Sequence, residues 1–358
     1  MNYWFTRKRT RQIQRKMTEP ETITEDEAAL YDRQIRLWGL DAQRRLRNSR
    51  VLLIGLRGLG AEIAKNVVLA GIKSLTLLDH TEATEEDSCS QFLIPPSEIG
   101  KNRAKSSLER TQQLNPMVNV TADDTNPEDK EDDYFTDFDV ICATCCSSSF
   151  LTKIDKICAD NNVKFFAGDV FGYYGYMFSD LGEHEYAEEV PKPKEKKSHP
   201  ESEEPSPKKS KVEDHETVVV KKCAKFARLQ QALDVDWSIP ENSRKLKRTP
   251  NTYFIMKILL KFIEQNGRRM CVKSRDDDIA VLNNLKNSVL EQMKINDNLV
   301  SEDFSSYCFA ELSPVCAIVG GVIGQEIIKA VSQKDPPHNN FFFYNGVNGE
   351  GLVDNIGS

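Results

Sequence analysis

The chain of 358 residues has little that would place it in a membrane, in an oxidising compartment or on nucleic acid. No uninterrupted apolar run approaches the roughly 18–20 residues that a membrane-spanning helix needs, so we expect no membrane partner. The nine cysteines are odd in number and lie mostly in apolar segments, which is typical of reduced, buried thiols. A net charge of −7 gives no general reason to expect nucleic acid as a partner.

Basic residues are concentrated at the start of the chain. Residues 1–17 hold six arginine and lysine residues and no acid, and we expect them to form a disordered basic arm. This composition fits an Arg-rich transit peptide, and it also fits an extension ahead of a start at Met17. The second alternative is favoured because a capped helix begins soon after Met17.

A segment rich in proline and charge interrupts the middle of the chain. Residues 191–217 contain five prolines and almost no apolar side chains, so they cannot offset the entropy of becoming ordered. We predict a linker over 183–222 that is disordered at about 191–217. Three of its lysines resemble a short nuclear import signal and predict a nuclear location, with the cytoplasm as a further possibility; they are Lys208, Lys209 and Lys211.

Strand and helix patterns alternate on the amino-terminal side of this linker, which is typical of a doubly wound α/β sheet. The predicted strands are 51–56, 74–79, 118–121, 139–143 and 163–167. The section 223–310 is predicted to be mostly helical. The last section, 311–358, is expected to return to the sheet of 18–182 with a Gly-rich helix over 315–331 and a terminal hairpin.

A glycine-rich turn follows the first predicted strand. Gly55-Leu56-Arg57-Gly58-Leu59-Gly60 leads from that strand into a helix, whose first amides would favour a phosphate. Asp79 ends the next strand, where dinucleotide-binding folds place the acid that binds ribose. This pattern fits a nicotinamide-dependent oxidoreductase, and it equally fits a turn whose glycines serve only close packing.

A capped helix precedes the first strand. Thr24 and Glu27 form a capping box that opens a predicted helix over Glu25–Trp38. Its apolar stripe consists of Ala28, Tyr31, Ile35 and Trp38. Arg33 lies off this stripe, so the helical pattern alone predicts a solvated surface side chain at this position.

These motifs, in this order, resemble the adenylation domain of the enzymes that activate ubiquitin-like proteins. The matching segments are Tyr31–Gly39, Gln91–Leu93, Asn115-Pro116, Gly168–Gly172 and the helix Pro314–Lys329. The resemblance covers nearly everything from Thr24 onward except the linker. It implies a Rossmann-like doubly wound sheet and a domain that uses ATP and Mg²⁺ to adenylate the modifier. The match is closest to non-catalytic subunits of the heterodimeric members, as in Cys145-Cys146 and Asp335–Phe343.

Several positions depart from the pattern of the catalytically active members. Arg57 stands where they have a second glycine, and its β-carbon should obstruct the approach of phosphates. Asp87 replaces an asparagine that positions the nucleotide, and it would repel phosphates. Ser90 replaces an arginine that contacts phosphate, and Thr81 replaces the second aspartate of the ribose motif.

Other parts of the family's machinery are also missing. Cys146 falls on the aspartate that binds Mg²⁺, and a neutral thiol is a poor ligand for a hard cation. No cysteine precedes threonine as the thioester-forming cysteine does, and the pair Cys142 and Cys145 cannot alone form the structural zinc site. We therefore expect no metal and no cofactor in this chain's own pocket. Its relic positions are Gly55, Arg57, Gly58, Gly60, Asp79 and Arg103, which stands where the family has a lysine.

The resemblance gives Arg33 a role. The corresponding arginine in the family crosses the subunit interface to the ATP phosphates of the partner, where a guanidinium suits the charge developing on pyrophosphate. We therefore predict a non-catalytic subunit that is inactive alone and pairs with a catalytic subunit, which binds ATP and Mg²⁺ and captures the modifier. The alternatives are a self-sufficient homodimeric adenylyltransferase of the sulfur-carrier-activating type and a scaffold in which Arg33 is inert.

Overall fold

The computed structural model describes residues 23–191 and 217–358 of the chain. The predicted basic arm, 1–17, lies outside the described residues, and so does the candidate import signal at Lys208, Lys209 and Lys211. The predictions made for those residues stay predictions.

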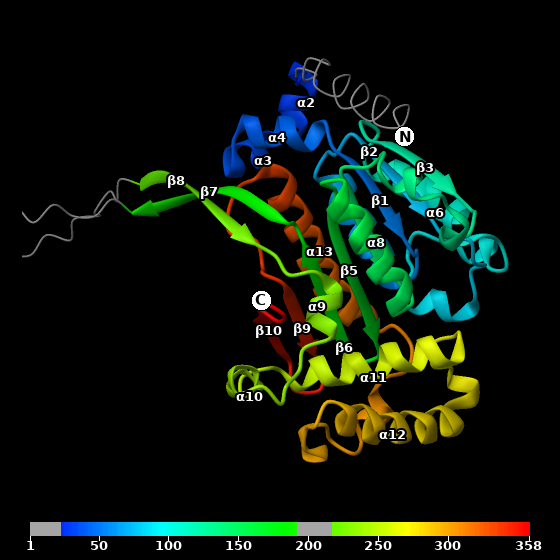
Figure 1. The fold of residues 1–358 in the computed structure, drawn as a ribbon. Helices are drawn as coiled ribbons and strands as arrows, with labels where there is room; N and C mark the ends of the chain where they lie inside the picture. Colours follow the sequence, from blue (N-terminus) through cyan, green and yellow to red (C-terminus); the bar gives the residue numbers. More distant parts are fainter. Residues whose placement is uncertain (1–22, 192–216) are drawn as a thin grey trace, which may run out of the picture.

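A mixed sheet of eight strands forms the centre of the described molecule, in the order β10-β9-β6-β5-β4-β1-β2-β3 (Figure 1). Five parallel strands are β1 (Arg50–Ile54), β2 (Ser74–Leu78), β3 (Asn119–Asp123), β4 (Val140–Thr144) and β5 (Lys164–Phe171). Three antiparallel strands are β6 (Tyr174–Asp180), β9 (Phe341–Asn345) and β10 (Glu350–Asp354). Helices cover both faces, which explains the continuous apolar runs of the parallel strands. The predicted α/β class and terminal hairpin are confirmed.

The two faces of the sheet have separate hydrophobic cores. Helices α4 (Leu40–Arg47), α5 (Gly58–Leu69), α6 (Arg103–Leu114) and α13 (Ser313–Ser332) cover one face. The other face is covered by α8 (Ser148–Asp160) and α11 (Asn251–Asn266), with the short α7 (Asp132–Phe135) beside α8. The loop between β1 and α5 lies at the carboxyl end of the parallel strands, which is where such sheets bind ligands.

The predicted helix Glu25–Trp38 is two helices, α2 (Glu25–Leu30) and α3 (Asp32–Trp38), although the capping box at Thr24 is confirmed. The helix is broken at Tyr31, which has φ −100° and ψ 15°. The Tyr31 ring is buried, and its hydroxyl accepts a hydrogen bond from Asn115 Nδ2 at 2.8 Å. Helical periodicity does not register this break, because Asn115 is 84 residues away in the chain.

The two ends of the predicted linker 183–222 form strands, which the sequence did not predict, whereas most of the part predicted to be disordered lies outside the described residues. β7 (Glu183–Pro191) and β8 (Thr217–Lys225) pair as an antiparallel ribbon that extends away from the main sheet (Figure 1). Cross-strand ion pairs join Lys222 to Glu188 at 2.6 Å and Lys225 to Glu183 at 2.8 Å. The charged composition that indicated a linker therefore includes charges that stabilise strand pairing.

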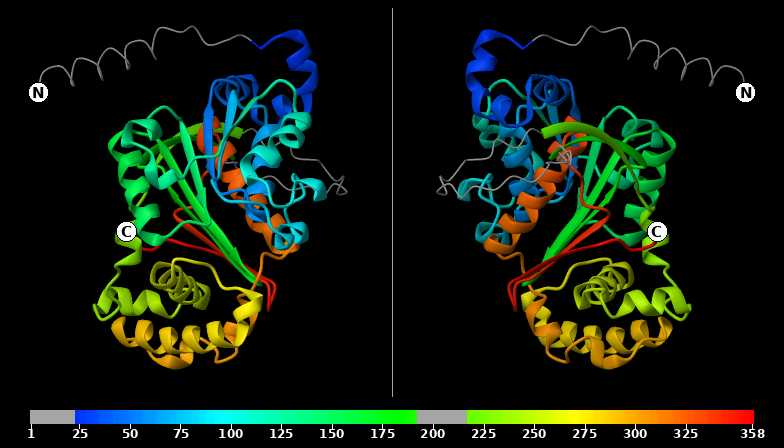
Figure 2. Two further views of the ribbon diagram at one scale, coloured as in Figure 1. Left: turned by 90° about the vertical axis from the view of Figure 1, so that its right-hand side faces the viewer. Right: turned by 90° about the vertical axis from the view of Figure 1, so that its left-hand side faces the viewer.

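The helical section consists of α9 (Leu229–Leu233), α10 (Pro240–Leu246), α11 and α12 (Arg275–Gln292). In both views of Figure 2 its longer helices lie together at one end of the sheet. Tyr253 of α11 is fully buried and contacts the rings of Phe341 and Phe343 in β9. The section therefore shares a hydrophobic core with the sheet.

Helix α13 is the most apolar long helix among the described residues, although no uninterrupted apolar run in the sequence marks it. By length and composition it is long and apolar enough to span a membrane, with a mean hydropathy of 1.6 over an 18-residue window. However, 56% of that window is buried inside the molecule, where α13 packs against α5 and the sheet. Glycine, glutamine and charged residues interrupt its apolar residues, so no single uninterrupted run reveals it.

Candidate functional site

The glycines of the turn between β1 and α5 are each required by a contact within this chain. Gly55 has φ +86°, and a β-carbon there would collide with the carbonyl oxygen of Thr144. A β-carbon on Gly58 would collide with Ser90 Oγ, and one on Gly60 would collide with the carbonyl oxygen of Gly55. The turn is thus closely packed by protein atoms at the positions where bare backbone would approach phosphates.

The first turn of α5 already carries an anion from this chain. The Leu59 amide donates a hydrogen bond to Glu311 Oε2 at 3.0 Å. Glu311 precedes α13 and is only 5% exposed. Because helix amino-termini attract anions, this carboxylate occupies the kind of position that a phosphate takes in nucleotide-binding relatives of the fold.

A buried ion network surrounds Glu311. Arg269 Nη1 contacts Asp169 Oδ2 at 2.5 Å, and Arg269 Nη2 lies 3.7 Å from Glu311 Oε1. Burial opposes the charge of Arg269, but Asp169 and its other neighbours outweigh burial and raise the pKa of the guanidinium. Cys145 Sγ lies 3.6 Å from Glu311 Oε1, and burial, followed by Asp169 and Glu311, raises the pKa of this thiol. Arg269 thus neutralises charge that the two carboxylates would otherwise bury unpaired.

These side chains do not fit Mg²⁺. Ligand atoms of Cys145, Asp169 and Glu311 lie within 4.8 Å of one another. Magnesium prefers oxygen ligands, whereas one of the three is a thiol with a raised pKa and both carboxylates are shared with Arg269. Cys146, the position matched to the family's metal ligand, has a thiol that donates to Thr144 O at 3.2 Å. The described residues therefore offer thiols and neutralised acids where a hard cation would need free carboxylates.

Asp79 is fully engaged by neighbouring donors. Its Oδ2 accepts hydrogen bonds from the Leu56 amide at 2.8 Å and from Arg103 Nη1 at 3.3 Å, and its Oδ1 accepts one from the Thr81 amide at 2.9 Å. The Thr81 hydroxyl also donates to Oδ1, at 2.5 Å, so a ribose hydroxyl would have to compete with four donors that already satisfy this carboxylate. The acid at the ribose position is therefore part of the core.

Arg103 joins Asp79 to a second acid. Its Nη2 donates to Asp87 Oδ2 at 2.9 Å and to Glu82 O at 3.0 Å, and the residue is 3% exposed. Asp87 also caps the short helix Glu85–Cys89 through the Thr84 amide at 2.7 Å. Burial opposes the charge of Arg103, but the two aspartates outweigh it and raise the pKa of the guanidinium. Asp87, which was predicted to repel phosphates, pairs with a cation of its own chain.

Arg57 and Arg33 differ from the other predicted site residues. Arg57 is the amino-terminal cap of α5 and is half-buried, close to the network around Cys145. Arg33 is exposed on α3, and no hydrogen bond or ion pair holds it within residues 23–191 and 217–358. Gln34 Nε2, next to it, donates to Leu69 O, the last residue of α5, at 3.1 Å.

Arg33 consequently lies at the far end of α5 from the glycine turn. This helix has 12 residues, and at 1.5 Å per residue it is roughly 18 Å long. The structure brings the glycine turn, Asp79 and Arg103 together in one place, and it places Arg33 out of reach of that place.

Sequence reasoning missed Glu311 and Arg269, and it quoted Asp169 only as part of a motif. Glu311 is an isolated acid in an apolar context, which could have marked it as a buried, paired carboxylate. Its partner, the Leu59 amide, is 252 residues away in the chain, and Asp169 and Arg269 are 100 residues apart. No local pattern connects such positions.

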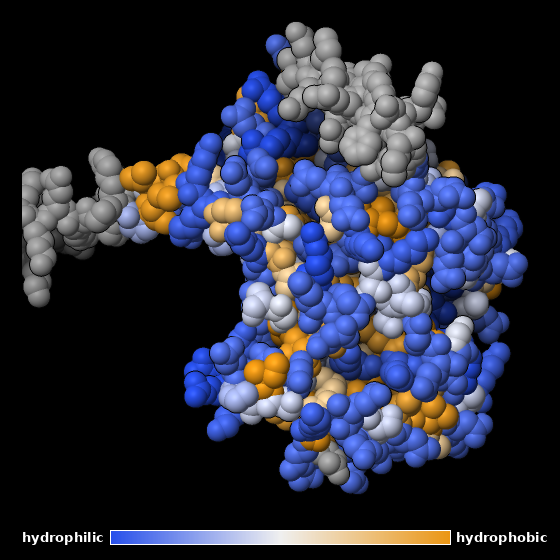
Figure 3. Space-filling model, viewed as in Figure 1, coloured by the Kyte–Doolittle hydropathy of each residue, from blue (hydrophilic) through white to orange (hydrophobic). Residues whose placement is uncertain are grey.

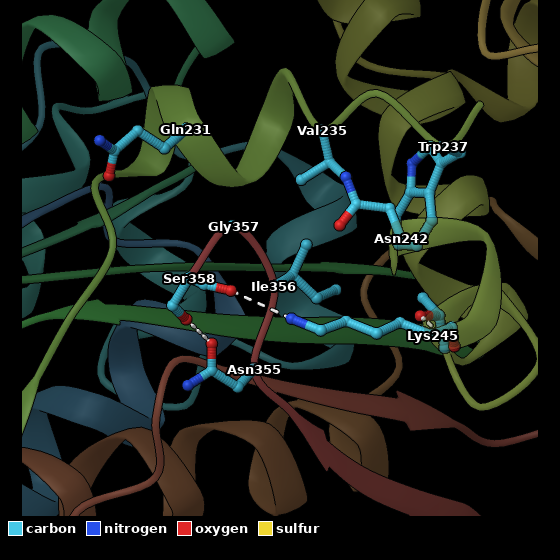
Figure 4. Close-up of a pocket in the computed structure, with 10 residues that line it drawn as sticks. Gln231, Val235, Trp237, Asn242, Lys245, Asn355, Ile356, Gly357 and Ser358 are labelled. Atoms are coloured by element: carbon cyan, nitrogen blue, oxygen red, sulfur yellow. Dashed lines mark hydrogen bonds between the residues drawn. The ribbon is translucent and has the colours of Figure 1, made fainter. Parts of the chain in front are cut away.

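A cavity of about 220 Å³ lies elsewhere, between the α9–α10 region and the end of the chain (Figure 4). It is lined by residues that include Trp237, Lys245 and Ile356, and Lys245 Nζ donates to Ser358 O at 3.0 Å across it. Lys245 is the only ionisable side chain among its lining residues. This cavity therefore lacks the paired groups that catalysis would need.

Residues 31–356 match the ThiF family, and the chain belongs to that family. The chain is 52% identical to a SUMO-activating enzyme subunit 1 from Xenopus tropicalis over 95% of this chain and 99% of the relative. It is 52% identical to the human protein of the same name, over 94% and 96%, and 53% identical to that of Danio rerio, over 95% and 98%.

Two solved structures share the fold at low sequence identity. PaaA is similar with a TM-score of 0.55 and 13% identity, over 95% of this chain and 76% of that chain. MccB from E. coli is similar with a TM-score of 0.50 and 12% identity, over 91% and 71%. At these identities the likeness shows the α/β fold alone.

Proposed function

We propose that this chain is the non-catalytic subunit of a heterodimeric SUMO-activating enzyme. The catalytic subunit binds ATP and Mg²⁺, and the terminal carboxylate of SUMO attacks the α-phosphorus of ATP there, releasing pyrophosphate. The cysteine thiolate of the catalytic subunit then attacks the acyl carbon of the adenylated SUMO, which forms a thioester and releases AMP. This chain forms the matching half of the adenylation core and contributes Arg33 to the partner's site.

The relatives and the state of the pocket support this proposal. Proteins named SUMO-activating enzyme subunit 1 match this chain at about 52% identity over nearly its whole length. The phosphate position at α5 is taken by Glu311, and the ribose position at Asp79 is taken by Arg103. A chain whose own pocket is filled in this way needs a partner for nucleotide chemistry.

The position of Arg33 is the observation that carries the proposal. The guanidinium is exposed and lies at the end of α5 opposite to the glycine turn, so it cannot act on a nucleotide in its own pocket. Leu30 and Leu37, each within about one helical turn of Arg33, are 57% and 70% exposed. An exposed cation among exposed leucines suits a subunit interface, where arginine can supply charge in trans.

ATP–pyrophosphate exchange with SUMO tests the division of labour between the subunits. We expect no exchange by this chain alone and full exchange after addition of the catalytic subunit, because only the partner's pocket is free to hold ATP and Mg²⁺. Exchange by the purified chain alone would support the self-sufficient adenylyltransferase and end the proposal.

Arg33→Ala tests the arginine in trans. We expect exchange by the reconstituted enzyme to fall by roughly 10²-fold, because charge developing on pyrophosphate loses a preorganised donor. Arg36→Ala is the matched control, since Arg36 lies one turn away and pairs with Asp32 at 3.0 Å on the surface. Size-exclusion chromatography should show an intact complex for both variants. Equal exchange by the two variants would leave this chain as a scaffold only.

A further inference from the structure

The two outer edges of the β7–β8 ribbon differ. The β7 edge is covered by the segment that follows α13: the Ala187 amide donates to Gln333 O at 2.9 Å, and the Asp335 amide donates to Ala187 O at 3.0 Å. The main-chain groups of Ala187 therefore both point away from β8.

This geometry determines which groups of β8 point outward. Ala187 lies opposite Lys221, so the two form a non-hydrogen-bonded pair and the main-chain groups of Lys221 also point away from the ribbon. The same holds for every second residue, including Val219 and Cys223. The intervening residues point inward: the Phe226 amide, for example, donates to Gly182 O at 2.9 Å, on the β7 side of the ribbon.

The outer edge of β8 is largely open in the part of the chain that the structure describes. Lys225 O accepts a hydrogen bond from Asn339 Nδ2 at 2.7 Å. No bond of that kind is seen among the described residues for the outward amides and carbonyls of Val219, Lys221 and Cys223. A row of unpaired donors and acceptors on an edge strand is a template for pairing with another strand.

The side chains of β8 favour an aliphatic and acidic partner strand. Val218, Val219 and Val220 are 38%, 63% and 36% exposed, and Figure 3 shows hydrophobic residues gathered on the projecting ribbon. The strand carries three lysines and no acid, and its Lys222 and Lys225 are already paired with glutamates of β7. Lys221 is exposed and has no ion pair among the described residues, so it is available to an incoming acid.

The ribbon is continuous with the surface that carries Arg33. Lys334 Nζ donates to Leu37 O of α3 at 3.2 Å and contacts Glu189 Oε1 of β7 at 3.3 Å. A partner seated on α3 would therefore extend toward β7 and the ribbon. This continuity favours the catalytic subunit over other occupants.

We propose that the outer edge of β8 docks an extended segment of the catalytic subunit, which adds to the ribbon as a third strand. Its aliphatic side chains lie against Val218–Val220, and an acid pairs with Lys221. The inference rests on the proposed heterodimer, but it can fail while the heterodimer stands.

Amide hydrogen exchange, resolved by residue with NMR, tests the docking edge directly. In the free chain the outward amides of Val219, Lys221 and Cys223 should exchange quickly, whereas the amides of Val220 and Lys222, bonded to β7, should exchange slowly. Addition of the catalytic subunit should slow the outward set by at least roughly tenfold.

Three outcomes would overturn the proposal. Unchanged outward amides in a complex that forms and exchanges pyrophosphate would refute the docking edge and leave the proposed function intact. The absence of any complex would refute both. Protection by SUMO alone, without the catalytic subunit, would assign the edge to the modifier.

A proline variant supplies an independent measurement. Val219→Pro removes one outward donor and leaves the bonds to β7 in place, because proline is tolerated on strand edges. We expect the complex to dissociate roughly three- to tenfold faster, as for the loss of one hydrogen bond. Glu185→Pro is the control. Glu185 lies opposite Cys223, so this variant removes an outward donor from the β7 edge instead, and it should dissociate like the wild type. Equal rates for the two variants, with the Val220 amide still protected, would contradict the proposal.

Discussion

At the scale of single residues, Glu311 and Arg103 stand where a nucleotide would make its contacts. Glu311 accepts a hydrogen bond from the Leu59 amide at the start of α5. Arg103 donates one to Asp79, which directly follows β2. Each side chain is almost fully buried, so its charge must be paired within the folded chain. The positions that bind nucleotide in other members of the fold are thus built into the core of this chain.

Removal of Arg103 should therefore destabilise the fold. Arg103→Ala leaves Asp79 and Asp87 buried without their cation, so we expect the free energy of unfolding to fall by roughly 3–5 kcal/mol. Lys105→Ala, on the same helix, breaks an exposed pair with Asp124 and should cost about 1 kcal/mol or less. Urea unfolding measures both. Similar losses for the two variants would show that the Arg103 network contributes no more than a surface pair.

At the scale of elements, α13 packs on α5 through a face of small residues. In this Gly-rich helix the adjacent glycines Gly320 and Gly321 differ in their surroundings. A β-carbon on Gly320 would lie 2.6 Å from Glu62 Cβ, and one on Gly324 would lie 2.6 Å from Asn66 Cβ. Gly321 has no neighbour within 4 Å of that position. The packed face consists of glycines four residues apart, as helical geometry requires.

Alanine substitutions at Gly320 and Gly321 should have different effects on the free energy of unfolding. Gly320→Ala should lower the free energy of unfolding by roughly 1–3 kcal/mol, because the new methyl group forces α13 and α5 apart. Gly321→Ala has open space and should be neutral or raise it by up to about 1 kcal/mol, because alanine is the better helix former. Chemical denaturation of the isolated chain provides the comparison. A stable Gly320→Ala variant would mean that the two helices can move apart at little cost.

At the scale of the whole molecule, buried carboxylates connect the sheet, α8 and the helical section. Asp155 of α8 accepts from the Leu229 amide at 2.8 Å, and Asp180 at the end of β6 pairs with Arg228 at 2.6 Å. Burial, followed by the charge of Asp180, raises the pKa of Asp155 to about 8. The junction between these parts therefore holds a proton near neutral pH.

This proton makes stability depend on pH. An unfolded aspartate has a pKa of about 3.9, so between about pH 4 and pH 8 the folded chain binds a proton that the unfolded chain has released. Stability due to Asp155 should be fully present below about pH 4 and should fall as pH rises toward 8. Asp155→Asn removes this dependence, so its urea midpoint should exceed that of wild type at pH 8 and approach it near pH 5.

Asp160→Asn provides the control for that experiment. Asp160 is exposed at the end of the same helix, and its variant should follow the pH profile of the wild type. If Asp155→Asn kept the wild-type profile, the proton would not be held at this junction.

Much of the fold is predictable because its signals are local. Buried parallel strands appear as apolar runs, the capping box at Thr24 marks a helix start, and the order of motifs indicates the family. Elements defined by distant partners were not predictable in the same way. The break at Tyr31 depends on Asn115, and the pairing of β7 with β8 brings together strands separated by 25 residues outside the described structure.

For the candidate site, the sequence by itself determined the chemical identities: which glycines, acids and arginines are present, and which family residues are replaced. Only the tertiary structure decided how they are used. It placed Glu311 on the Leu59 amide across 252 residues, and it placed Arg33 at the far end of α5 from the glycine turn. The physical reason is that burial and charge pairing act through space, whereas sequence patterns report mainly on neighbours along the chain.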